Sequence, residues 1–302
     1  PRRACLGPSE CHYLSVTREQ KNYTGYQRHV VEETLNKLVG SRVAAPSGDV
    51  AGHAAGTVYE DLVFNAVSGV RSDGVFRQHE ILNRVLLENE SVTDPVERER
   101  LLGPPGQSRL LRRGVSSMEE WSRDNQFSYK QNDTADCVLI PVAASIQAPS
   151  DLDRLVMLDV KSHNSTRVSQ APNIISSKKL YEAGFDAVRA CRESNREELS
   201  FEILYSFVSW ELDGGDMVCN KTDTMSLFKT DPVSLRINWA AGGQIQFHPW
   251  DVGQEWSGTS VEWMVAYLEH RNASRERNLS RTRDECRKDA KLLEELLATD
   301  AV

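Results

Sequence analysis

The sequence predicts an α/β (α+β) domain in which a mixed central β-sheet is flanked by helices. Short apolar runs rich in β-branched residues concentrate between residues 137 and 239. Segments with apolar residues at three- and four-residue spacing precede, interrupt and follow these runs, which is typical of helices that pack on a sheet. Hydrophobic residues make up 39% of the 302 residues, enough for a sizeable core.

The individual elements follow from the period of the apolar residues. Helical segments have apolar side chains on one side only, and are expected at residues 26–38, 53–67, 79–101, 173–191 and 261–297. A Gly-Pro-Pro-Gly sequence at residues 103–106 breaks the third of these helices. Strand segments are short apolar or alternating runs, and are expected at residues 137–142, 155–160, 201–212, 217–219 and 234–239.

The chain divides into three parts by composition. Residues 1–26 are polar and irregular and are expected to form an N-terminal extension, residues 27–270 the main domain, and residues 271–302 a charged helical tail. No run approaches the ~18 apolar residues of a membrane span, and the first residues lack the apolar run of a secretory signal. The six cysteines are scattered, as expected for reduced thiols, so the chain is expected to be cytoplasmic and without a membrane partner.

The charge balance leaves the partner open. A formal net charge of -8 argues mildly against nucleic acid, because phosphate contacts need local lysine and arginine. It does not exclude nucleic acid, since local patches and bound cations decide binding. Arg109, Arg112 and Arg113 form the densest basic cluster of the first half, and this cluster is either a solvated helix face or a phosphate-facing one.

Two acids and a lysine are expected to meet at one end of the sheet. Asp136 begins the first predicted strand and Asp159 ends the second. If these strands form an antiparallel hairpin centred near residues 147–148, Asp136 lies opposite Asp159. Side chains two residues apart share one face of a strand, so Lys161 lies beside Asp159 while Val160 points the other way.

This arrangement suits metal-assisted phosphodiester hydrolysis. Two adjacent carboxylates repel each other unless a hard cation lies between them, and magnesium prefers oxygen ligands. Asp136, Asp159 and the backbone carbonyl of Val160 are therefore the candidate ligands, and Lys161 is the candidate to orient or deprotonate the attacking water. A solvated surface hairpin is the alternative, because Asp and Lys are common residues.

Several blocks of sequence resemble the HincII-like type II restriction endonucleases, which belong to the PD-(D/E)xK nuclease superfamily. The blocks occur in one order over roughly residues 27–270. They are GHAAG at 52–56, the segment 111–121, QNDTAD at 131–136, LDVK at 158–161, QAPNIIS at 170–176, INWAA at 237–241, QIQFH at 244–248 and the segment 258–263.

The resemblance implies a restriction-endonuclease-like core in a homodimer that cuts both strands of a palindromic DNA duplex. It implies a magnesium-dependent enzyme that recognises a GTYRAC-like site, leaves blunt ends and works beside a cognate DNA methyltransferase. Asp136 and Asp159 match the family's metal-binding acids and Lys161 its catalytic lysine. The residues matched to DNA contact are Gln131, Asn164, Ser169, Gln170, Asn173 and Asn238. Ser169 and the glycines at 242–243 depart from the family pattern, which puts the recognised sequence in doubt.

Other residues and functions are weighed beside this interpretation. Glu60 is either an accessory acid near the metal or a polar position on its helix, and Trp239 and Phe247 are expected in the core. A structure-specific DNA repair nuclease and a DNA-binding protein that no longer cleaves remain the alternative functions. The intact set of Asp136, Asp159 and Lys161 argues against the second alternative.

Overall fold

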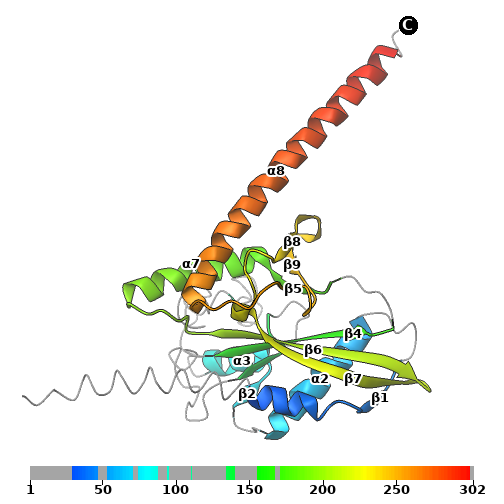
Figure 1. Cartoon of the computed structure of the whole chain (residues 1–302), viewed down its shortest axis with the longest axis vertical. Coiled ribbons are helices and arrows are strands. Elements are labelled where there is room, and N and C mark those ends of the chain that lie inside the picture. Colours follow the sequence, from blue (N-terminus) through cyan, green and yellow to red (C-terminus); the bar gives the residue numbers. More distant parts are fainter. Residues whose placement is uncertain are drawn as a thin grey trace, which may run out of the picture.

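Two β-sheets and a set of helices form the body of the protein (Figure 1). The computed structural model describes residues 29–46, 53–70, 74–87, 94, 110, 134–139, 155–166 and 171–299. The larger sheet has six strands, which in spatial order are β1 (Arg42–Ala44), β7 (Asp216–Ser226), β6 (Glu202–Asp213), β4 (Val156–Asn164), β3 (Cys137–Leu139) and β2 (Val75–Phe76). The smaller sheet has three, which are β5 (Asn173–Ser176), β9 (Gln244–Gln246) and β8 (Arg236–Asn238).

The larger sheet is mixed, as the sequence predicts. Among the described strands of this sheet only β4 and β6 run parallel, and every other neighbouring pair is antiparallel. The parallel pair needs a crossover, and α7 (Ser177–Glu193) lies between these strands in the sequence. Ser176 starts α7 by accepting a hydrogen bond from the Lys179 N–H through its hydroxyl.

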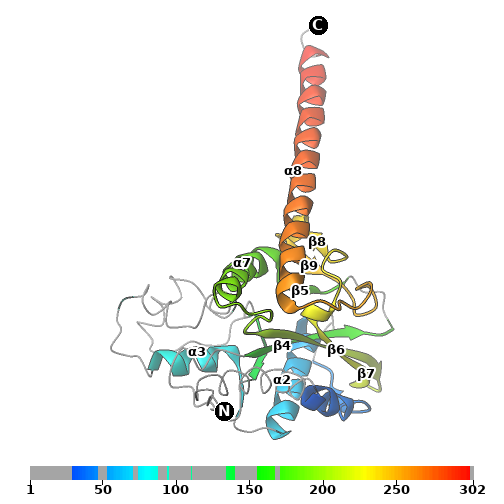
Figure 2. The same cartoon turned by 60° about the vertical axis from the view of Figure 1, so that its left-hand side comes forward.

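Two cores cover the two faces of the larger sheet. One face packs against α7, the smaller sheet and the first turns of α8 (Ser260–Thr299), and α3 (Gln78–Leu87) belongs to the same core. The other face packs against α2 (His53–Val70) and a helix at residues 29–36. Alternation along the strands produces this division, since Met157 enters the first core and its neighbours Val156 and Leu158 enter the second. Figures 1 and 2 show the helices on both sides of the sheet.

Helix α8 has a packed beginning and an exposed end. Trp263, Met264 and Tyr267 are fully buried. Gly184 of α7 permits this close packing, because a Cβ there would lie 2.2 Å from the Met264 sulfur. Residues 279–294 are exposed, and the helix projects away from the body (Figure 2). The helix is continuous through residue 270, where the sequence places the boundary between domain and tail.

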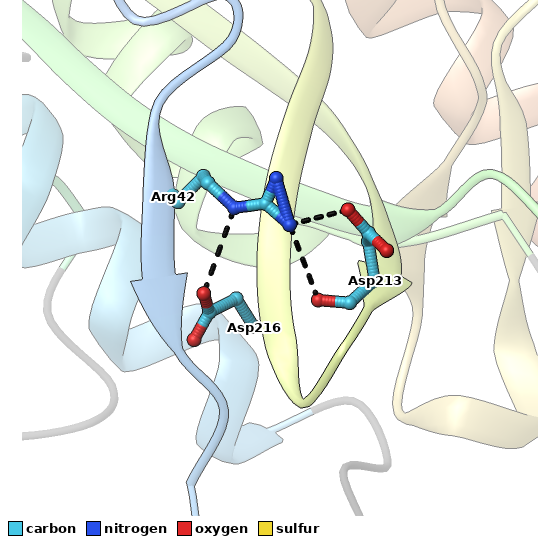
Figure 3. Close-up of polar contacts among 3 residues, drawn as sticks. All are labelled: Arg42, Asp213 and Asp216. Atoms are coloured by element: carbon cyan, nitrogen blue, oxygen red, sulfur yellow. Dashed lines mark hydrogen bonds and ion pairs between the residues drawn. The ribbon is translucent and has the colours of Figure 1, made fainter.

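An arginine joins the short edge strand β1 to the larger sheet. Figure 3 shows the Arg42 guanidinium between Asp213 and Asp216, at the turn that connects β6 to β7. The Arg42 Nε atom lies 3.6 Å from the Asp216 carboxylate. These side chains are half exposed, so the ion pairs are expected to add little stability, although they favour the register in which Ala44 pairs with Asp216.

The structure corrects several predicted elements. Residues 173–176 form β5 where a helix is predicted, so α7 begins only at Ser177. Strands β1, β2 and β9 have no predicted counterpart, because two or three residues are too few to show a period. Trp239 is only partly buried, whereas Phe247 lies in the core as predicted.

Other predictions fall outside the described residues or agree with them. Those outside include the N-terminal extension at residues 1–26, the breaker at residues 103–106, the cluster at Arg109, Arg112 and Arg113, and the part of the third predicted helix beyond residue 87 except Asp94. Within the described ranges, no helix combines the length and apolar character needed to cross a membrane.

Candidate active site

The antiparallel pairing predicted for the strands on either side of residues 147–148 is present. Strands β3 and β4 pair antiparallel, with Cys137 opposite Leu158 and Leu139 opposite Val156. Asp136 directly precedes β3, and the same register places it opposite Asp159. The predicted juxtaposition of Asp136 and Asp159 is therefore confirmed, although each carboxylate's chemical role stays a prediction.

Backbone contacts fix the position of Asp136. Its Oδ2 atom accepts a hydrogen bond of 2.7 Å from the Val160 N–H, so the side chain bonds to the middle of β4 beside the start of β3. The residues before it are held by buried Gln78, whose Oε1 accepts from the Thr134 N–H at 2.8 Å and the Ala135 N–H at 3.0 Å. The two residues before Asp136 are thus bound to the first residue of α3, a contact that sequence spacing alone does not predict.

Lys161 and Asp159 form an ion pair on the same face of β4. The Lys161 Nζ lies 2.6 Å from the Asp159 Oδ2. The Asp159 side chain is 8% exposed and that of Lys161 22%. A buried ion pair of this kind loses hydration, so its retention in the core points to a functional rather than a stabilising role.

Burial and mutual repulsion set the charges of this group. Burial raises the pKa of the Asp136 carboxyl, while the positive charge of Lys161 and the Val160 hydrogen bond partly oppose the increase. Burial also raises the pKa of Asp159 well above its ordinary value, with Lys161 opposing and Asp136 adding to the increase. For Lys161, burial lowers the pKa, but the two carboxylates outweigh it and the net pKa is raised.

The donor set fits a hard divalent cation. The two carboxyl groups lie close enough to hydrogen bond to each other, so their ionised forms need a positive charge beside them. Among the residues that the structure describes, no group of three or more His, Cys, Asp or Glu side chains forms a fuller cage. Magnesium is commonly held by only one or two carboxylates, with waters and substrate phosphate oxygens as the other ligands.

Two further charged residues influence the site from the α2 side. The guanidinium of Arg77, which follows β2, lowers the pKa of Asp136 and stacks 4.1 Å from the centre of the Phe64 ring. The negative charge of Glu60 raises the pKa of Lys161 as the weakest of its several causes. Glu60 is therefore near the site without joining the acid pair, and its accessory role stays a prediction. Arg77 was missed because a single arginine after a two-residue strand carries no sequence signal.

The predicted recognition residues Asn173 and Asn238 lie on β5 and β8, the two outer strands of the smaller sheet. Gln246, on the central strand β9, connects them through a chain of amide hydrogen bonds. The Asn238 Nδ2 donates to the Gln246 Oε1 at 3.0 Å, and the Gln246 Nε2 donates to the Asn173 Oδ1 at 2.8 Å. The Asn238 Oδ1 accepts from the Ala241 N–H at 3.2 Å. Each amide is thereby held in one orientation before any ligand binds.

The other predicted DNA contacts are less informative. Gln131, Ser169 and Gln170 lie outside the described residues. Asn164 ends β4, where its Oδ1 accepts hydrogen bonds from the backbone and hydroxyl of Thr166 at 2.9 and 2.7 Å. In this structure Asn164 thus stabilises the turn after β4.

Helix α8 braces the turn that carries Asn238. Trp239 follows Asn238 and donates from its indole nitrogen to the Ser274 hydroxyl at 3.0 Å. The Arg275 guanidinium stacks 4.7 Å from the Trp239 ring, and Arg271 lies between Trp239 and Tyr181. These contacts explain why Trp239 is not a core residue, and they involve residues beyond the predicted domain boundary at 270.

The mixed sheet flanked by helices is consistent with a restriction-endonuclease-like α+β fold, and it carries two facing carboxylates with a lysine two residues after the second. The family model described as "Restriction endonuclease HincII" matches residues 34–290. The chain is 40% identical over 243 residues to both the type II restriction enzyme HindII and the type II restriction enzyme HincII of Haemophilus influenzae. The match covers 80% of this chain and 88% of each relative. The chain therefore belongs to the HincII family of type II restriction endonucleases.

Proposed function

We propose that the protein is a magnesium-dependent type II restriction endonuclease that hydrolyses duplex DNA with Asp136, Asp159 and Lys161. The observation that carries the proposal is the β3–β4 hairpin, which brings two buried carboxylates and one ammonium to the same end of the sheet. Membership of the HincII family supports the same reaction.

The backbone of Val160 is well placed to complete the metal ligands. Its N–H points toward Asp136. The N–H and C=O of one strand residue point toward the same neighbouring strand, so the Val160 carbonyl also points to the Asp136 side. A magnesium ion bound by Asp136, Asp159 and this carbonyl would neutralise the phosphate and make a bound water more acidic.

Lys161 is proposed to orient the attacking water and to stabilise the negative charge that develops on the phosphate. Because the neighbouring carboxylates raise its pKa, Lys161 is an ammonium at neutral pH. In that form it donates hydrogen bonds and carries positive charge. The described site thus favours orientation and charge stabilisation over proton abstraction by Lys161.

Recognition is proposed to be that of the family, a palindromic GTYRAC-like site cut to blunt ends by a homodimer with one active site in each protomer. Asn173 and Asn238 are the described candidates for base contacts, because amide groups can donate and accept at base edges. Gln131, Asn164, Ser169 and Gln170 complete the proposed DNA-contacting set, and Glu60 is the proposed accessory acid. A cognate methyltransferase is the expected functional partner, since the host DNA needs protection.

The test is digestion of a fully sequenced phage genome with magnesium, with calcium and with excess chelator, followed by mapping of the cut ends. We expect discrete bands with magnesium, binding with little cutting in calcium, and no cutting in chelator. Full activity in excess chelator would contradict the metal assignment.

Asp136→Ala and Asp159→Ala should each abolish cutting while far-UV circular dichroism stays unchanged, and Asp284→Ala on exposed α8 is the matched control.

Branched substrates and a DNA-binding assay, added to the digestion, separate the alternative functions. A repair nuclease would cut branched substrates in preference to linear duplexes, and its products from phage DNA would not be discrete bands. A DNA-binding protein that does not cleave would slow duplex DNA in a gel mobility assay with either metal, and would cut the DNA with neither.

A further inference from the structure

An exposed tryptophan, Trp250, contacts a residue of β4 and follows β9 of the proposed recognition sheet in the sequence. Trp250 is 63% exposed and stacks on His248, with ring centres 4.5 Å apart and planes within 8° of parallel. The His163 ring meets the Trp250 ring edge-on at 5.7 Å. We call His163, His248 and Trp250 the Trp250 platform.

The platform belongs to the same strand as the proposed catalytic residues. His163 lies two residues beyond Lys161 on β4, so the side chains of Asp159, Lys161 and His163 follow one another on one face. Two strand residues span about 6.6 Å, which is comparable with the separation of neighbouring phosphates in one DNA strand. If the scissile phosphate of a DNA strand lies at Lys161, the neighbouring phosphate of the same DNA strand is therefore within reach of the platform.

The platform is also continuous with the recognition sheet. His248 and Trp250 directly follow β9, the strand that carries Gln246. Phe247 fixes this segment over the large sheet, where its ring lies 6.2 Å from Tyr205 and 6.3 Å from Phe207. His163 and His248 lie two residues beyond Lys161 and Gln246, so a duplex that contacts both Lys161 and Gln246 is close to the platform.

Contacts within the protein hold the platform residues in place. The His163 Nε2 lies 3.1 Å from the hydroxyl of Ser209, the residue that pairs with it on β6. Stacking on His248 holds one face of Trp250. An exposed aromatic ring that is fixed in this way loses little freedom on binding, which is the property of residues that dominate interfaces.

We propose that the Trp250 platform binds the sugar–phosphate backbone of the cleaved strand beside the scissile phosphate. The indole packs on a deoxyribose, and the imidazoles of His163 and His248 donate to a phosphate oxygen. Burial and the neighbouring His248 lower the pKa of His163, so its ring is a neutral hydrogen-bond donor at neutral pH. Contacts with the sugar–phosphate backbone of DNA do not depend on the base sequence, so the platform should bind duplexes of any sequence equally. This inference rests on the proposed function.

The first test measures duplex binding in calcium by fluorescence anisotropy, with cognate and unrelated sequences. Trp250→Ala should weaken both affinities by the same factor, about tenfold, and Trp250→Phe should restore part of the loss. Phe185→Ala removes another exposed aromatic ring, on α7, and is the matched control. Unchanged affinity in Trp250→Ala, or a loss confined to the cognate site, would overturn the proposal.

The second test identifies the contacted phosphate. Duplexes with a single uncharged methylphosphonate, placed in turn at each position near the cut, are bound by wild type and by His163→Ala. One position adjacent to the scissile phosphate should weaken binding by the wild type more than binding by His163→Ala, in which only His248 still donates to that phosphate. If the penalties in His163→Ala match those of wild type at every position, the proposal is wrong.

Sedimentation of the same variants distinguishes DNA from a second copy of the chain as the occupant. We expect Trp250→Ala to keep the wild-type oligomeric state, and dissociation into smaller species would overturn the proposal. A wild-type protein that cuts no DNA would instead contradict the proposed function, whatever the platform binds.

Discussion

The hairpin of the candidate active site and the smaller recognition sheet are built in different ways. The hairpin joins two consecutive strands, and its residues face each other because of the register between β3 and β4. The smaller sheet joins β5 to two strands from a segment some 60 residues further along, and one amide chain links its side chains. The arrangement of the proposed catalytic residues is thus encoded locally, whereas the proposed recognition residues depend on contacts between distant segments.

The two regions also differ in what supports them. The hairpin lies within the six-stranded sheet, and the polar groups of its site are buried among apolar residues. The smaller sheet has three strands of three or four residues, and α8 supports its Asn238 turn through Trp239. Substitutions at the hairpin should therefore change the chemical step, while substitutions around the smaller sheet should change the choice of DNA sequence.

The largest expected effect is that of Lys161→Ala, which should lower the cleavage rate by roughly 10²–10⁴-fold. Binding of cognate duplex in calcium should survive, because the ammonium acts mainly on the transition state. Single-turnover cleavage and anisotropy measure the two quantities. An equal loss of binding and cleavage would show that Lys161 anchors a phosphate instead.

Gln246→Ala should lower cleavage at the mapped site by about tenfold, since a lost base contact typically costs ~1–3 kcal/mol. The variant removes the link between Asn173 and Asn238, so both amides lose their fixed orientation. Cleavage rates over all single-base variants of the site measure the loss of discrimination. Gln244→Ala, on the same face of β9, is the control, and a uniform slowing at every site would mean that Gln246 only supports the backbone.

Ser274→Ala should have a smaller effect, a fall of roughly threefold at the mapped site with little change at unrelated sites. It removes the hydroxyl that accepts from Trp239, a bond worth about 0.5–1.5 kcal/mol. Ser274→Thr should preserve most of the activity, and Ser280→Ala on the exposed part of α8 should have no effect. A fall in turnover with an unchanged sequence profile would show that the brace stabilises the fold without positioning Asn238.

Asp136→Asn should stabilise the protein in chelator while abolishing cleavage. The folded state raises the pKa of Asp136 above the ordinary aspartate pKa of about 4. The ionised carboxyl therefore lowers the free energy of unfolding as the pH rises above about 4. The asparagine keeps an oxygen for the Val160 N–H and removes the charge. We expect the Tm to rise by roughly 2 °C at neutral pH and the difference to disappear toward pH 4. Calorimetry from pH 4 to 8 measures it, and a lower Tm for the variant at neutral pH would contradict this interpretation.

Most of the active site could be predicted because its geometry follows from strand alternation. Asp136, Asp159 and Lys161 need only one hairpin register to meet, and the apolar runs on both sides of the loop fix that register. The longer helices α2 and α8 could be predicted for a similar reason, since each repeats its pattern over several turns. The short strands β1, β2 and β9 contain too few residues to show any pattern.

The sequence by itself thus determined the mixed sheet, the facing acids and, through its ordered motifs, the family. Only the tertiary structure decided that β5 precedes α7, that Gln246 joins Asn173 to Asn238, that Gln78 anchors the approach to Asp136, and that α8 braces Trp239. The physical reason is the separation of the partners along the chain. A contact between neighbours is set by local backbone geometry, whereas a contact across 35 or 73 residues exists only once both segments have packed on the same core.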